Sequence, residues 1–139
     1  MNEQANTRVV KEMYDAFQRN DIPGLLARMD DNITFRIPGP DYVPVVGVYS
    51  GRKELETFFS KLEQAMDFSQ FEPREYVAQG DRVIALGYYR GKAKATGREF
   101  EADWVMAWTI RNGKAVEFQE YTDTEAMAGA FRAERGMGA

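Results

Sequence analysis

The sequence predicts an α+β fold, with helices in the first half of the chain and an antiparallel sheet in the second. Before residue 66, apolar residues recur at the i, i+3, i+4 and i+7 spacing of amphipathic helices. From Phe71 onward apolar and polar residues alternate instead, which indicates strands. The length of 139 residues is that of one ordinary domain. We therefore expect a single domain, residues 1–139, in which the N-terminal helices pack on a curved antiparallel sheet.

Two helices are expected at the N-terminal end. Apolar residues at helical spacing predict the first, over about residues 9–20. Asp21 is a favourable N-cap for the second helix, and Pro23 is tolerated in its first turn. We expect this short helix to end at residues 30–32, where three consecutive polar residues interrupt the apolar pattern.

A strand and a third helix are expected next. Ile33, Phe35 and Ile37 alternate with polar residues, and the Pro-Gly-Pro sequence at 38–40 ends that strand. A loop should follow. The apolar spacing of residues 55–66 then gives the strongest helix signal in the chain.

Four antiparallel strands should occupy the rest of the chain, beginning near Phe71. Gly80-Asp81, Gly97 and the Asn-Gly pair at 112–113 indicate the three turns between them. The sequence Thr-Asp-Thr-Glu at 122–125 matches a capping box, which predicts a short final helix. Residues 136–139 are expected to fray.

The strand over residues 100–110 is apolar on both faces at its middle. Trp104 and Trp108 fall on the face expected to meet the helices, whereas Val105 and Ala107 fall on the other. Scattered apolar residues on a surface are common and need no partner. We nevertheless expect a second copy of the chain to cover this face, giving a homodimer through the sheet.

Composition excludes several classes of function. Cysteine and histidine are both absent, which excludes disulfides, thiol nucleophiles, Ser-His-Asp triads and imidazole bases. No metal or cofactor is predicted, because no histidine-containing ligand set exists. The net charge of −4 argues against nucleic acid as a partner. No apolar stretch is long enough to cross a membrane and the N-terminus lacks the features of a secretory signal, so a cytoplasmic location is expected.

The order of elements, together with four local segments, resembles the nuclear transport factor 2-like superfamily, specifically its SnoaL-like and ketosteroid isomerase-like members. These segments are residues 14–21, 26–33, 49–54 and 112–123. The resemblance spans about residues 6–131. It implies a cone-shaped, cystatin-like fold whose concave sheet face and helices enclose a mostly apolar cavity for a small hydrophobic ligand.

The resemblance also shows which catalytic groups are missing. Ketosteroid isomerases place a tyrosine and two aspartates where this chain has Met13, Ile37 and Met106, so steroid isomerisation is not expected. Limonene-epoxide hydrolases use an Asp-Arg-Asp set, and this chain matches it with one carboxylate, Glu120, and with Gly87 and Tyr89 at the other two positions. SnoaL-like cyclases use an aspartate with a histidine, and histidine is absent here.

Glu120 and Tyr89 are the candidate catalytic residues. Glu120 alternates with Phe118 and Thr122 on the inward face of its strand, where loss of solvation favours its protonated form and suits acid/base work. The alternatives are a structural carboxylate bonded to a hydroxyl, or an outward-facing residue if a β-bulge reverses the alternation. Further residues are expected to line the cavity: Met13, Tyr14, Phe17, Phe35, Ile37, Phe59, Trp104, Met106, Trp108 and Phe118.

Two functions fit these residues. The first is acid/base catalysis on a hydrophobic substrate, of the isomerase, cyclase, dehydratase or hydrolase type. The second is non-catalytic binding or sensing of a small hydrophobic ligand, because the groups that serve isomerases are missing. Fold alone does not separate the two.

Overall fold

The computed structural model describes residues 2–132, and the predicted fraying of residues 136–139 lies outside them. The elements in chain order are α1 (Glu3–Gln18), α2 (Ile22–Ala27), β1 (Met29–Ile37), β2 (Gly47–Ser50), α3 (Gly51–Ala65), β3 (Met66–Gln79), β4 (Arg82–Ala93), β5 (Glu99–Arg111), β6 (Lys114–Thr122) and α4 (Thr124–Phe131). The predicted α+β fold is confirmed. In the described part of the chain, no helix is both long enough and apolar enough to span a membrane.

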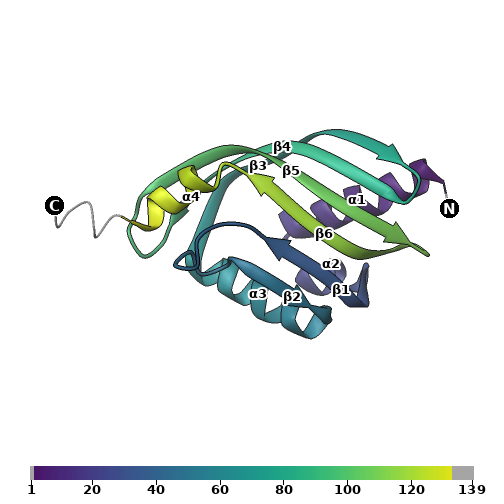
Figure 1. Cartoon of the computed structure of the whole chain (residues 1–139), viewed down its shortest axis with the longest axis horizontal. Coiled ribbons are helices and arrows are strands. Elements are labelled where there is room, and N and C mark those ends of the chain that lie inside the picture. Colours follow the sequence, from purple (N-terminus) through teal and green to yellow (C-terminus); the bar gives the residue numbers. More distant parts are fainter. Residues whose placement is uncertain (1, 133–139) are drawn as a thin grey trace.

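The strands form one curved sheet in the order β2-β1-β6-β5-β4-β3 (Figure 1). Neighbouring strands are antiparallel except for β1 and β6, which run parallel with Phe35 beside Phe118. The expectation of a wholly antiparallel sheet is therefore wrong for this pair. Alternation along a strand shows which residues share a face, but it does not show which distant strand lies alongside.

Three strand boundaries also differ from the prediction. Strand β1 begins at Met29, where the second helix was expected to continue to residues 30–32, because α2 already ends at Ala27. Residues 47–50 form β2, an edge strand paired with residues 34–37, where a loop was expected. Four residues are too few to show a recognisable alternation. Strand β3 begins at Met66, directly after α3, and not near Phe71.

The helices pack on the concave side of the sheet. Helix α1 buries Val10, Met13 and Tyr14 against β3, β4 and β5, while α3 lies on β1 and β2 (Figure 1). Asp21 caps α2 as predicted, since its carboxylate accepts a hydrogen bond from the Gly24 N–H over 3.0 Å. Apolar helix faces and the apolar concave face together make one core.

The cap of α4 is shifted by one residue from the prediction. Asp123, and not Thr122, accepts the hydrogen bond from the backbone N–H of Ala126. Thr122 is instead the last residue of β6, so its hydroxyl is free for contacts within the sheet.

Strand β4 is pressed closely against its neighbours at Gly87. A Cβ atom at this position would lie 2.3 Å from the Trp104 ring and 2.5 Å from the carbonyl oxygen of Glu72. Only glycine fits so close an approach. The adjoining strand β3 has irregular pairing on either side, between Phe68 and Gln70 and between Pro73 and Glu75. Such irregularities bend a strand and increase its twist, which is consistent with the curvature of the sheet here.

Candidate functional site

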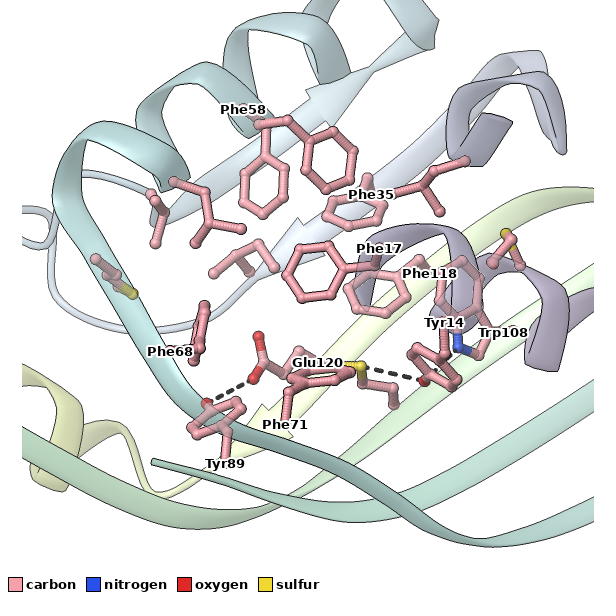
Figure 2. Close-up of a pocket in the computed structure, with 18 of the residues that line it drawn as sticks. Tyr14, Phe17, Phe35, Phe58, Phe68, Phe71, Tyr89, Trp108, Phe118 and Glu120 are labelled. Carbon is pink, nitrogen blue, oxygen red and sulfur yellow. Dashed lines mark hydrogen bonds between the residues drawn. The ribbon is translucent and has the colours of Figure 1, made fainter. Parts of the chain in front are cut away.

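A cavity of about 90 Å³ lies between the concave face of the sheet and the helices. Its wall is almost entirely apolar and rich in aromatic rings (Figure 2). Cavities that hold drug-sized ligands are typically about 300–1,000 Å³. The inner cavity as it stands therefore suits a small ligand, or part of a larger one.

Glu120 is the one carboxylate among the residues described in this wall. Strand β6 directs it inward together with Phe118, because the β5–β6 pairing is regular from Thr109 to Trp104. Glu120 is only 6% exposed. Burial raises its pKa from 4.5 to about 7, and the hydrogen bond from Tyr89 partly offsets that rise.

The two carboxylate oxygens of Glu120 face different surroundings. Oε2 lies 2.7 Å from the hydroxyl oxygen of Tyr89 on β4. Oε1 points away from Tyr89 and into the cavity (Figure 2). Glu120 therefore presents one oxygen to a ligand while the other is held by the protein.

Tyr89 connects Glu120 to a second hydroxyl. Its Oη also lies 3.0 Å from Thr122 Oγ1, and Thr122 donates to the backbone carbonyl oxygen of Asp103 over 3.1 Å. Burial is the main cause that raises the pKa of Tyr89, and the nearby charge of Glu120 adds to it. Tyr89 is therefore a neutral hydrogen-bonding group at neutral pH.

Tyr14 on α1 supplies the other hydroxyl of the wall. Trp108 Nε1 donates to Tyr14 Oη over 3.0 Å, and the Tyr14 hydroxyl itself donates to Met106 Sδ over 3.2 Å (Figure 2). A thioether sulfur is a weak acceptor. Burial raises the pKa of Tyr14, so its proton is retained and is available to a stronger acceptor.

Eleven of the twelve residues predicted for the site lie in the cavity wall. They are Met13, Tyr14, Phe17, Phe35, Ile37, Phe59, Tyr89, Met106, Trp108, Phe118 and Glu120. The matched isomerase positions, Met13, Ile37 and Met106, thus face the cavity although they carry no ionisable group.

Trp104 is the exception, because it does not line the cavity. It stacks on Phe71, with ring centroids 5.3 Å apart and planes at 21°, and its ring lies over Gly87. Phe71 is itself part of the wall. Trp104 is therefore a core residue behind the wall, and its Nε1 has no hydrogen-bond partner among residues 2–132.

Several wall residues were not predicted. They are Leu25, Met29, Val45, Phe58, Leu62, Met66, Phe68, Phe71 and Met127. Phe58 and Leu62 belong to the predicted apolar face of α3, which was the available signal. Met66, Phe68 and Phe71 were missed because β3 starts earlier than its alternation indicates.

A second hollow, of about 400 Å³, adjoins the cavity and shares wall residues with it. The shared residues are Phe17, Phe59, Leu62, Met66, Phe68 and Phe71. Its remaining lining includes the polar side chains Gln18, Asn20 and Gln70. Between residues 2 and 132, no three acidic, His or Cys side chains converge as metal ligands.

Comparison with known proteins gives the family. No protein of curated function matches the chain significantly. An NTF2-like protein of Burkholderia xenovorans LB400 is 40% identical, covering 94% of this chain and 98% of its own, with a TM-score of 0.86. An NTF2-like protein of unknown function from Burkholderia pseudomallei K96243 is 29% identical over the same shares, with a TM-score of 0.82.

A further similar structure, TerC co-crystallised with polyporic acid, is 26% identical over 92% of this chain and 98% of its own, with a TM-score of 0.80. These structures confirm the NTF2-like fold. The SnoaL-like domain matches residues 10–118. The chain therefore belongs to the SnoaL-like family of the nuclear transport factor 2-like superfamily.

Proposed function

We propose that this protein is an enzyme that uses Glu120 as a general acid and base on a small hydrophobic substrate. One observation carries the proposal: a buried carboxylate, with one oxygen facing an apolar cavity and a pKa of about 7. A general base is most effective when its pKa lies near the working pH. A carboxylate is seldom buried in an apolar wall without a specific role.

Removal of a proton from a carbon next to a carbonyl is the reaction that suits this wall. Ionised Glu120 takes the proton on Oε1, while Tyr89 donates to Oε2. The electron pair left on the substrate moves to its carbonyl oxygen, and Tyr14 donates a hydrogen bond to that oxygen. Protonated Glu120 then returns its proton to another carbon, which completes an isomerisation. Alternatively, the new carbanion attacks a second carbonyl and Glu120 protonates the resulting alkoxide, which completes a cyclisation.

One similar structure supports a small organic ligand. TerC, at 26% identity, was crystallised with polyporic acid. The aromatic wall described above offers ring faces on which a planar molecule can stack. The adjoining hollow gives room for the part of a ligand that exceeds the inner cavity.

Hydrogen exchange on model ketones tests the proposal without knowledge of the natural substrate. Small aryl ketones are incubated with the protein in D₂O, and NMR follows the loss of hydrogens next to the carbonyl. We expect Glu120→Gln to slow the protein-dependent exchange about 10²- to 10⁴-fold, the usual contribution of a general base. Glu101→Gln is the matched control, because Glu101 is exposed and bonds to Tyr88. An unchanged rate in Glu120→Gln contradicts the proposal.

Non-catalytic binding of a hydrophobic ligand is the second candidate function. The apolar residues at Met13, Ile37 and Met106 favour it, since these positions carry the catalytic groups of ketosteroid isomerases. Native mass spectrometry of the purified protein separates the two candidates. A bound metabolite that is unaltered after incubation, combined with no exchange on any ketone, supports binding alone.

We also propose that the convex face of the sheet is a homodimer interface. Val77 and Tyr121 are each 57% exposed there, and Val105 lies beside Tyr121 in the strand pairing. Ile84 on β4 pairs with Val77 on β3, so the apolar surface extends from β3 onto β4. Sedimentation equilibrium at micromolar concentration should give twice the chain mass, and a monomer at that concentration contradicts the dimer.

A further inference from the structure

Three side chains form a hydrogen-bonded chain that leads away from the cavity. Glu120 Oε2 lies 2.7 Å from Tyr89 Oη, which lies 3.0 Å from Thr122 Oγ1, and Thr122 donates to the Asp103 carbonyl oxygen over 3.1 Å. Glu120 and Thr122 are two residues apart on one face of β6, while Tyr89 approaches both from β4. The same tyrosine thus contacts the proposed catalytic acid and a neighbouring hydroxyl.

The number of hydroxyl protons in this hydrogen-bonded network limits which of its groups can donate to one another. The Asp103 carbonyl oxygen can only accept, so the single hydroxyl proton of Thr122 is committed to it. Thr122 then offers a lone pair to Tyr89. Because Tyr89 also has one proton, it can donate either to Thr122 or to Glu120, but not to both.

Each of the two orientations of the Tyr89 hydroxyl is compatible with one protonation state of Glu120. When Tyr89 donates to Thr122, a lone pair of its oxygen faces Oε2, and only a protonated Glu120 can bond to it. When Tyr89 donates to Glu120, the carboxylate is stabilised and Thr122 loses its donor. The first arrangement pairs every polar group of the network within the protein, whereas the second leaves one lone pair of the half-buried Thr122 to solvent.

We propose that Thr122 is a positioning residue for Glu120. By accepting a hydrogen bond from the Tyr89 hydroxyl, Thr122 prevents that hydroxyl from donating to the Glu120 carboxylate, and this increases the proton affinity of Glu120. Only the expected effect of Thr122 on turnover rests on the proposed function. The effect on Glu120 itself follows from the hydrogen bonds whether or not the protein is an enzyme.

The other groups around Glu120 do not provide this effect. Tyr14 approaches from α1, and it carries no charge near pH 7, since burial raises its pKa above the ordinary tyrosine value. Asp123 acts on Tyr89 through its charge and adds to the rise of the tyrosine pKa. Helices α3 and α4 and strands β1 and β3 contribute apolar side chains to this wall, such as Phe58 and Met127.

Two substitutions should move the pKa of Glu120 in opposite directions. Thr122→Val leaves Tyr89 with Glu120 as its only acceptor, which favours the carboxylate and lowers the pKa by about one unit, the equivalent of one hydrogen bond. Tyr89→Phe removes the donor to the carboxylate and raises the pKa. A substitution that only loosened the packing would admit water and lower the pKa in both variants.

Carboxyl ¹³C NMR across pH 4–9 measures this pKa directly, with the Glu120 resonance identified by its absence in Glu120→Gln. Thr122→Ser keeps the hydroxyl and should retain the wild-type pKa. Thr122→Ala removes it without adding a methyl group and replaces Thr122→Val if that variant does not fold. An unchanged or raised pKa of Glu120 in Thr122→Val and Thr122→Ala overturns the proposal, as does a lowered pKa in Thr122→Ser.

The failure of this inference is distinguishable from failure of the proposed function. If Glu120 is the catalytic base, the midpoint of the pH profile for ketone exchange should fall together with the NMR pKa in Thr122→Val. A pKa that falls while no ketone exchanges supports the role of Thr122 and contradicts catalysis. A profile that does not move although exchange requires Glu120 contradicts the role of Thr122.

Discussion

Adjacent tyrosines on β4 each pair with a glutamate, but on opposite faces of the sheet. On the convex face, Tyr88 Oη donates to Glu101 Oε1 over 2.5 Å at the surface. On the concave face, Tyr89 lies 2.7 Å from Glu120 in the cavity wall. The two pairs contain the same chemical groups at nearly the same separation.

Their surroundings set the two pairs apart. The Glu101 hydrogen bond is the main cause that raises the pKa of Tyr88, whereas burial is the main cause for Tyr89. Burial also brings the pKa of Glu120 to about 7. The hydrogen bond from Tyr89 lowers the pKa of Glu120, so the raised pKa comes from the loss of solvation and not from the tyrosine.

The largest expected difference between the pairs is in how stability depends on pH. Between pH 4.5 and about 7 the folded chain keeps the Glu120 proton that the unfolded chain has lost, so folding is favoured at low pH and this advantage disappears as pH rises through about 7. A shift from 4.5 to about 7 corresponds to about 3 kcal/mol.

Relative to Glu120→Gln, wild-type protein should therefore lose about 3 kcal/mol of unfolding free energy between pH 4 and pH 8. Urea denaturation at a series of pH values measures the difference, and Glu120→Gln should be the more stable protein at pH 8. Glu101→Gln is the control and should follow the wild-type curve. Parallel curves for wild type and Glu120→Gln would show that Glu120 is solvated like Glu101.

A smaller difference is expected when each tyrosine loses its hydroxyl. Tyr89→Phe leaves a buried carboxylate oxygen without its donor, which should lower the unfolding free energy at pH 8 by about 1–3 kcal/mol. Tyr88→Phe should cost less, because water can replace its hydroxyl at the surface. Urea unfolding of both variants at one pH gives the comparison, and equal losses would contradict the distinction between the two faces.

Most of the fold was predictable because it follows from local patterns. Helical spacing and alternation identify α1, α3 and the meander β4 to β6, and the NTF2-like resemblance is confirmed. The parallel pairing of β1 with β6 was missed because it joins strands far apart in the chain. Strand β2 was missed because four residues carry too little pattern.

The site was predictable as far as the alternation of apolar and polar residues along a strand shows which face of the sheet each side chain occupies. Glu120 faces inward because the irregularity in the β5–β6 pairing falls between Thr109 and Ile110, away from it. Trp104 shows the limit of such reasoning. It shares a face with Trp108, but the close approach of β4 at Gly87 and the stacking of Phe71 place it behind the wall. Contacts between neighbouring strands determine whether Trp104 reaches the cavity, and these contacts cannot be predicted from the sequence of one strand.

The apolar side chains at Met13, Ile37 and Met106 have a consequence for how such proteins diverge. The backbone directs each of these positions into the cavity, while the residue type alone determines what chemistry it brings. Point substitutions can therefore replace one reaction with another, without insertions or deletions. Two chains of this fold can therefore align over nearly their whole length and yet carry different chemical groups in the cavity.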